Sequence, residues 1–115
     1  MSKILVVDDD SGLRSASRRM LTARDYKVVE AEEGQQALDI LAQGGIDIVV
    51  TDIDMPGMGG IELIDKMQEA GYTTPVMILS GSAEADPEYS GRLVRFGKPL
   101  VSEVYLNALA KLLTK

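Results

Sequence analysis

The feature that most constrains the fold of this sequence is a series of short apolar, β-branched runs separated by segments with helical spacing. The runs occupy residues 3–7, 27–31, 46–52, 75–80 and 92–97. Such runs are typical of strands that helices cover on both faces. Their alternation with helices predicts an α/β fold, a doubly wound five-stranded parallel sheet with right-handed crossovers and the strand order 2-1-3-4-5 (flavodoxin-like).

Apolar residues at helical spacing predict a helix after the first, second, third and fifth runs. The expected core stripes are Leu13, Ala16, Met20 and Leu21 in the first helix, with Arg14, Arg18 and Arg19 on its other side; Ala37, Leu38 and Leu41 in the second; Ile61, Leu63, Ile64 and Met67 in the third; and Val101, Val104, Tyr105, Ala108 and Leu112 in the last. Asp10 or Ser11 is expected to cap the first helix. We interpret these stripes as core and not as cofactor contacts.

Between the fourth and fifth runs the helical signal fades. Glycine, serine, proline and acidic residues interrupt the periodicity at 81–91, so at most a turn or two of helix fits there. The sequence therefore predicts a shortened or irregular fourth helix.

Composition narrows the classes of function. The 115 residues predict one domain, 1–115, with 45% hydrophobic and 26% charged residues. The chain has no cysteine and no histidine, so a bound metal would need oxygen ligands, which favours magnesium, calcium or manganese. A net charge of −6 argues against direct nucleic acid binding, and no run suits a membrane span or a signal peptide, so we expect a cytoplasmic protein.

Polar residues stand where the apolar runs end. Asp8 and Asp9 follow the first run, Asp52 ends the third, Ser80 ends the fourth and Lys98 follows the fifth. The carboxyl ends of parallel strands share one edge of the sheet, and the first and third strands flank its switch point. We therefore expect these five side chains to form one site, although a lone Asp before a Pro-Gly loop would more simply cap a turn.

Three carboxylates at that edge would repel one another by roughly 3 kcal/mol per pair, at ~5 Å and an effective dielectric of about 20. A divalent cation relieves this cost, and Mg²⁺ suits a shell of carboxylates, a carbonyl and waters. Lys98 as a point charge and Ser80 as a hydrogen-bond donor would suit a phosphoryl group. Without histidine or cysteine the plausible nucleophile is a carboxylate, so Asp52 would form an acyl phosphate.

The sequence resembles the receiver domains of bacterial two-component response regulators over its whole length. The resemblance rests on Asp8-Asp9 after Ile-Leu-Val-Val, the run Asp-Ile-Val-Val-Thr-Asp-Ile-Asp-Met-Pro-Gly-Met-Gly-Gly, the strand Pro-Val-Met-Ile-Leu-Ser and the pair Lys98-Pro99. It implies a signalling switch that catalyses only its own phosphorylation and dephosphorylation. The phosphodonor would be a sensor histidine kinase or a phosphotransfer protein, and the downstream partner is not identified by the sequence.

The resemblance also assigns roles to single residues. It implies that Asp52 accepts the phosphoryl group, that Asp9 and Asp52 bind Mg²⁺ directly and Asp8 through water, and that the Asp54 backbone carbonyl completes the shell. It further implies that Ser80, Gly81 and Lys98 contact the phosphoryl group and that Lys98-Pro99 is a cis peptide. Asp54 and Ser82 stand at positions that tune hydrolysis of the acyl phosphate in the family, although Asp54 alternatively only caps the Pro56 turn.

Two features depart from the family pattern. The stretch from Ser80 to Lys98 is shorter than usual, and Arg95 occupies the position of the usual aromatic switch residue, with Phe96 one place later. Ser80, Arg95 and Phe96 are therefore the switch candidates, while Arg95 is equally well explained as a solvated cation. Ordering of residues 81–91 is an alternative readout.

Two other functions fit parts of the pattern. A receiver-fold binding module that signals without phosphorylation would keep the fold and lose the chemistry. A haloacid-dehalogenase-like phosphatase also uses an aspartyl phosphate, but there the acidic pair follows the lysine, and this chain leaves no room for a cap domain. Whether the chain is a stand-alone regulator or part of a longer protein is open.

Overall fold

The computed structural model of the protein describes residues 2–53, 55–80, 87–97 and 102–113. In chain order its elements are β1 (Lys3–Val7), α1 (Ser11–Thr22), β2 (Lys27–Ala31), α2 (Gly34–Ala42), β3 (Ile48–Asp52), α3 (Gly60–Glu69), β4 (Val76–Ser80), β5 (Leu93–Gly97) and α4 (Ser102–Leu113). Each predicted strand ends at the same residue as the observed strand and begins at most two residues before it.

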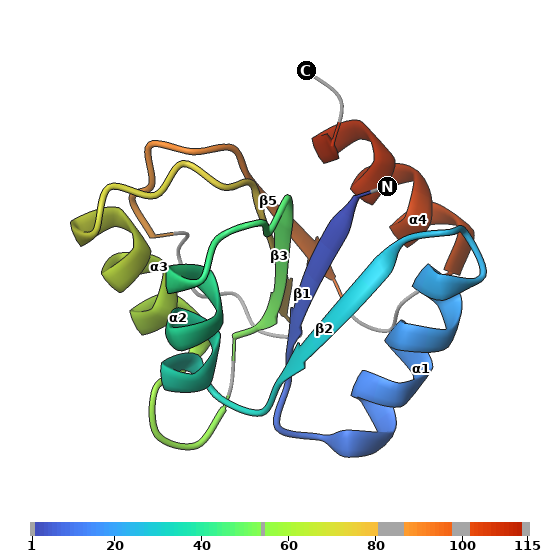
Figure 1. Cartoon of the computed structure of the whole chain (residues 1–115), viewed down its shortest axis with the longest axis horizontal. Helices are drawn as coiled ribbons and strands as arrows, with labels where there is room; N and C mark the ends of the chain where they lie inside the picture. The colour runs from blue at the N-terminus through green and yellow to red at the C-terminus, as the bar shows by residue number, and fades with distance from the viewer. Residues whose placement is uncertain (1, 54, 81–86, 98–101, 114–115) are drawn as a thin grey trace.

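The five strands form one sheet in the order β2-β1-β3-β4-β5. All four neighbouring pairs are parallel. Helices α2 and α3 cover one face of the sheet, and α1 and α4 cover the other (Figure 1). The predicted fold class and strand order are therefore confirmed, and the carboxyl ends of all strands lie at one edge.

Alternate residues of the central strands supply two separate cores. Leu5 and Val7 of β1 belong to the cluster under α2 and α3, and Ile4 and Val6 belong to the cluster under α1 and α4. All five residues of β3 are buried. The sheet that carries the acidic residues is thus fixed by packing from both sides.

The predicted core stripe of α1 was wrong in part. Leu13 is 47% exposed and Ala16 is also exposed, whereas the Arg14 side chain, assigned to the solvent side, is only 11% exposed. The buried residues of α1 are Ser17 and Leu21. Arg14 instead contacts the Asp8 carbonyl oxygen just after β1 and the Glu30 carboxylate of β2, and the spacing of apolar residues does not predict these contacts.

One position in the last predicted stripe was also wrong. Val104 is 54% exposed, while Tyr105, Leu109 and Leu112 of α4 are buried against the sheet. Val101 lies outside the described residues.

The predicted irregular fourth helix falls partly on residues 81–86, which lie outside the described part of the chain. Residues 87–92 form no helix. There the Tyr89 hydroxyl donates a hydrogen bond to the Thr74 carbonyl oxygen at 2.6 Å. None of the helices in the described ranges has the length and the apolar character that a membrane crossing requires.

Tyr105 gives a test of the core between α4 and the sheet. Burial raises the pKa of Tyr105 from 10.0 to about 12, and the nearby Ser17 hydroxyl lowers it in part. Because the folded-state pKa is the higher one, this contribution to stability is complete below pH 10 and is lost as the pH rises toward 12. The free energy of unfolding of Tyr105→Phe should therefore fall less steeply over this range than that of the wild type.

Chemical denaturation at closely spaced pH values would measure this slope. Burial raises the pKa of Tyr89 to about 12 as well, so Tyr89→Phe should remove a second part of the slope and the double variant both parts. An unchanged slope in Tyr105→Phe would contradict the prediction.

Candidate functional site

Three carboxylates meet at the carboxyl ends of β1 and β3. Asp8 and Asp9 follow the last residue of β1, and Asp52 is the last residue of β3. One carboxylate oxygen of each lies within 4.8 Å of the others. Asp8 and Asp52 are 6% and 7% exposed, and Asp9 is exposed, so the cluster is open to solvent on the Asp9 side.

The register of the sheet explains this convergence. Val7 of β1 pairs with Thr51 of β3, so the next residue on each strand is an aspartate at the same edge. Oxygen atoms at this spacing suit a hard divalent cation, which takes several carboxylate, carbonyl and water ligands. The residues present therefore fit a hard divalent cation such as Mg²⁺.

The turn from Asp8 to Asp10 is held by its own hydrogen bonds. The Asp8 amide donates to the Ala31 carbonyl oxygen at 3.1 Å, which extends the pairing of β1 with β2 beyond Val7. The Asp10 amide donates to Asp8 Oδ1 at 2.9 Å. The Asp10 carboxylate accepts from the Gly12 and Leu13 amides and is the N-cap of α1, which decides between the two predicted caps.

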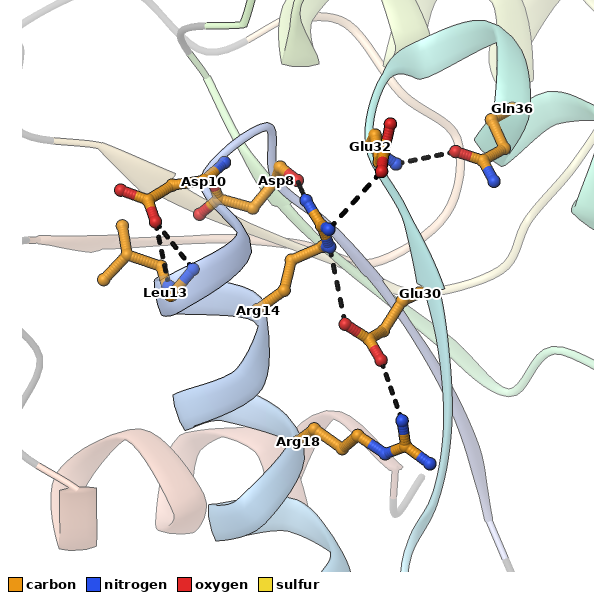
Figure 2. A network of polar contacts seen from close by, with 9 residues as sticks. Asp8, Asp10, Leu13, Arg14, Arg18, Glu30, Glu32 and Gln36 are labelled. Carbon is orange, nitrogen blue, oxygen red and sulfur yellow. Dashed lines mark hydrogen bonds and ion pairs between the residues drawn. The ribbon is translucent and has the colours of Figure 1, made fainter.

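Arg14 joins this turn to β2 (Figure 2). Its Nη1 donates to the Asp8 carbonyl oxygen at 2.7 Å. The same guanidinium lies 3.4 Å from the Glu30 carboxylate and 3.6 Å from that of Glu32. Arg18, one turn later, pairs only with Glu30 in this network, at 3.1 Å. Sequence reasoning missed Arg14 because its partners lie outside α1, in the turn after β1 and in or just after β2.

The chain after Asp52 makes a close turn into α3. The Ile53 carbonyl oxygen accepts from the Gly60 amide at 3.0 Å. A Cβ at Gly60 would collide with the Asp52 carbonyl oxygen, so α3 begins in direct contact with the backbone of the candidate nucleophile. Further along the loop, the Met58 carbonyl oxygen accepts from the Gly34 amide at 3.3 Å, and the Met58 side chain fills the space beside Gly34.

The structure brings only some of the predicted site residues together. Ser80 ends β4 and pairs in the backbone with Gly97 of β5, at the same sheet edge as Asp52. The remaining predicted site residues, Asp54, Gly81, Ser82 and Lys98, and the Lys98-Pro99 peptide lie outside the described residues.

The other two switch candidates, Arg95 and Phe96, lie on β5 and are half-buried. The Phe96 ring packs edge to face against Tyr105, with 6.1 Å between ring centroids.

Comparison with known proteins identifies the family. Residues 4–98 match the family described as the response regulator receiver domain. The chain belongs to this family. This receiver domain is 33% identical over 115 residues to sporulation initiation phosphotransferase F of Bacillus subtilis, covering 96% of this chain and 93% of that protein.

The receiver domain also resembles the response regulator MprA of Mycolicibacterium vanbaalenii, with 35% identity over 89 residues. That match covers 77% of this chain and 38% of MprA, so the receiver domain spans only about two fifths of this longer relative.

Solved structures show the same fold. The receiver domain of the hybrid histidine kinase CckA superposes with a TM-score of 0.85 at 33% identity, covering 98% of this chain and 100% of the other. The chemotaxis protein CheY4 of Vibrio cholerae superposes with a TM-score of 0.82 at 28% identity, covering 97% and 98%.

The contact between Gly60 and the Asp52 backbone predicts a large effect of a single methyl group. Gly60→Ala should lower the free energy of unfolding by about 2–3 kcal/mol, because the opposing carbonyl belongs to a buried strand and cannot move aside cheaply. Gly12→Ala is the matched control, because a Cβ there would meet only the end of the Asp10 side chain at 3.2 Å. Urea denaturation compares the two, and equal stability of Gly60→Ala and wild type would contradict the prediction.

Proposed function

We propose that this receiver domain accepts a phosphoryl group on Asp52 in a Mg²⁺-dependent reaction and thereby switches the binding of a partner protein. The observation that carries the proposal is the convergence of Asp8, Asp9 and Asp52, with carboxylate oxygens within 4.8 Å at the switch point of a parallel sheet. The family match supports it. The relative in Bacillus subtilis is named sporulation initiation phosphotransferase F, which supports phosphoryl transfer as the chemistry.

In this proposal the acidic residues divide the work. Asp9 and Asp52 would hold the ion directly and Asp8 through water, and the Asp54 carbonyl would supply a further ligand. When bound, Mg²⁺ would neutralise charge on the carboxylates and on the incoming phosphoryl oxygens. Asp8 is more buried than Asp9. Its Oδ1 accepts a hydrogen bond from the Asp10 amide, which keeps the Asp8 carboxylate directed toward the site.

The proposed reaction is a displacement at phosphorus. An Asp52 carboxylate oxygen forms a bond to phosphorus while the bond from phosphorus to the donor histidine nitrogen breaks, and the imidazole leaves with the electron pair and takes up a proton. Lys98 and Ser80 then stabilise the charge on the phosphoryl oxygens, and Gly81 leaves room for them. Asp54 and Ser82 stand at the sequence positions that, by the family resemblance, tune how fast water hydrolyses the acyl phosphate.

The remaining parts of the proposal concern context. The donor is a sensor histidine kinase or a phosphotransfer protein, residues 1–115 act as one receiver domain, and the reaction takes place in the cytoplasm. The domain is a switch and not a catalyst of turnover on other substrates. Ser80, Arg95 and Phe96 are the residues through which phosphorylation would alter the surface.

The first prediction from this proposal concerns the acceptor. After incubation with acetyl phosphate and Mg²⁺, the intact mass of the wild type should increase by one phosphoryl group, because Asp52 is the nucleophile. Asp52→Asn should show no increase, and Asp65→Asn, which removes an exposed carboxylate of α3, should behave like the wild type.

Chelation of Mg²⁺ should abolish the increase in mass. Wild type that binds Mg²⁺ but gains no mass, even with a phosphohistidine donor, would contradict the proposal and favour a binding module that signals without phosphorylation.

The second prediction concerns charge repulsion. Without divalent cations, Asp9→Asn should unfold with a free energy about 1–3 kcal/mol higher than that of wild type, because one of the clustered charges is removed. Saturating Mg²⁺ should stabilise the wild type more than the variant, because Asp9 is a ligand.

Urea denaturation in EDTA and in Mg²⁺ would measure both effects, with Asp65→Asn as the control for loss of a charge elsewhere. An equal gain from Mg²⁺ in Asp9→Asn and wild type would show that Asp9 does not bind the ion.

A further inference from the structure

Arg14 holds together three segments of the chain beside the acidic cluster. Its guanidinium donates to the Asp8 carbonyl oxygen at 2.7 Å and pairs with Glu30 of β2 and with Glu32 just after it. Its side chain is only 11% exposed. The guanidinium makes one hydrogen bond, to the Asp8 carbonyl oxygen, and ion pairs with the Glu30 and Glu32 carboxylates, so groups from two other segments restrict its position.

The bond to the Asp8 carbonyl bears directly on Asp9. The peptide unit between Asp8 and Asp9 is planar, so fixing its carbonyl oxygen also fixes the plane from which Asp9 continues. Asp9 is exposed, so side-chain packing contributes little to its position. On the C-terminal side of Asp9, the Asp10 carboxylate caps α1, so the position of Asp10 is also fixed.

We propose that Arg14 is a positioning residue for the metal site: it holds the Asp8–Asp9 peptide so that both carboxylates are already arranged for a divalent cation. This rests on the proposed function, since it concerns the same ion. Arg14 does not touch the ion or the phosphoryl group and acts through the backbone of Asp8. Glu30 and Glu32 hold the guanidinium in place from β2.

Electrostatics alone predicts the opposite effect of removing Arg14. Loss of a positive charge near three carboxylates should strengthen the binding of Mg²⁺, because the cation then meets less repulsion. Loss of positioning should weaken it, because the ion must then order the turn when it binds. The sign of the change therefore separates the two roles.

The matched pair of variants is Arg14→Met and Arg18→Met. Both remove one charge from α1 and one ion pair with Glu30, and both keep an unbranched side chain with good helix propensity. Only Arg14 reaches the Asp8 carbonyl oxygen. Calorimetry on the unphosphorylated full chain, well below the unfolding midpoint of each variant, would give the dissociation constant for Mg²⁺.

We expect Arg14→Met to weaken Mg²⁺ binding by about tenfold, the effect typical of residues that orient metal ligands, and Arg18→Met to leave it unchanged or slightly tighter. Without metal, the Asp10 amide, which donates to Asp8 Oδ1, should exchange its hydrogen faster in Arg14→Met only. Arg14→Lys keeps the charge but has no planar fork, so it should not restore wild-type affinity.

The outcomes are separable. Absence of Mg²⁺ binding by the wild type would overturn the proposed function, and this proposal with it. Wild-type or tighter affinity in Arg14→Met, or full affinity in Arg14→Lys, would overturn the positioning role alone and leave the metal site standing.

Discussion

The acidic site depends on the packing of the sheet, which holds three mutually repelling carboxylates close together. Asp8, Asp9 and Asp52 lie at the ends of two hydrogen-bonded neighbouring strands, with oxygens within 4.8 Å of one another. A flexible chain would separate them, since each pair costs up to about 3 kcal/mol at an effective dielectric of about 20. They stay together because β1 and β3 are buried between two helical layers, and their register cannot slip without moving every core side chain to the opposite face. Hydrophobic packing thus sustains a local negative charge density that suits a bound cation.

The sequence predicted the sheet well because its strands are buried on both faces. Continuous apolar runs such as Ile-Leu-Val-Val and Ile-Val-Val can be recognised as strands without knowing which strands they pair with. Their alternation with helices restricts the topology to a few arrangements. The acidic site followed from the same logic, because residues at the ends of parallel strands share one edge. Local pattern was therefore sufficient wherever position along a strand determines position in space.

The sequence failed where a contact joins distant segments. Leu13 reads as core by its spacing, yet it is 47% exposed, because α1 is turned so that Arg14 faces the sheet. The long stem of an arginine packs as an apolar side chain while its guanidinium meets acidic partners. Those partners, Glu30 and Glu32, come from β2 and the residues after it. The periodicity of α1 alone therefore does not reveal that Arg14 faces the sheet. The packing of Met58 on Gly34 escaped notice for the same reason.

The two switch candidates of β5, Arg95 and Phe96, face opposite sides of the sheet. Arg95 pairs with Ile78 of β4, and Phe96 pairs with Leu79. Successive residues of a strand face opposite sides, and Phe96 packs in the cluster under α1 and α4, so Arg95 belongs to the other face. The aromatic ring is therefore one residue and one face away from the place where the family keeps it. Its edge contact with buried Tyr105 ties it to α4, so rotating Phe96 would disturb the core cluster under α1 and α4.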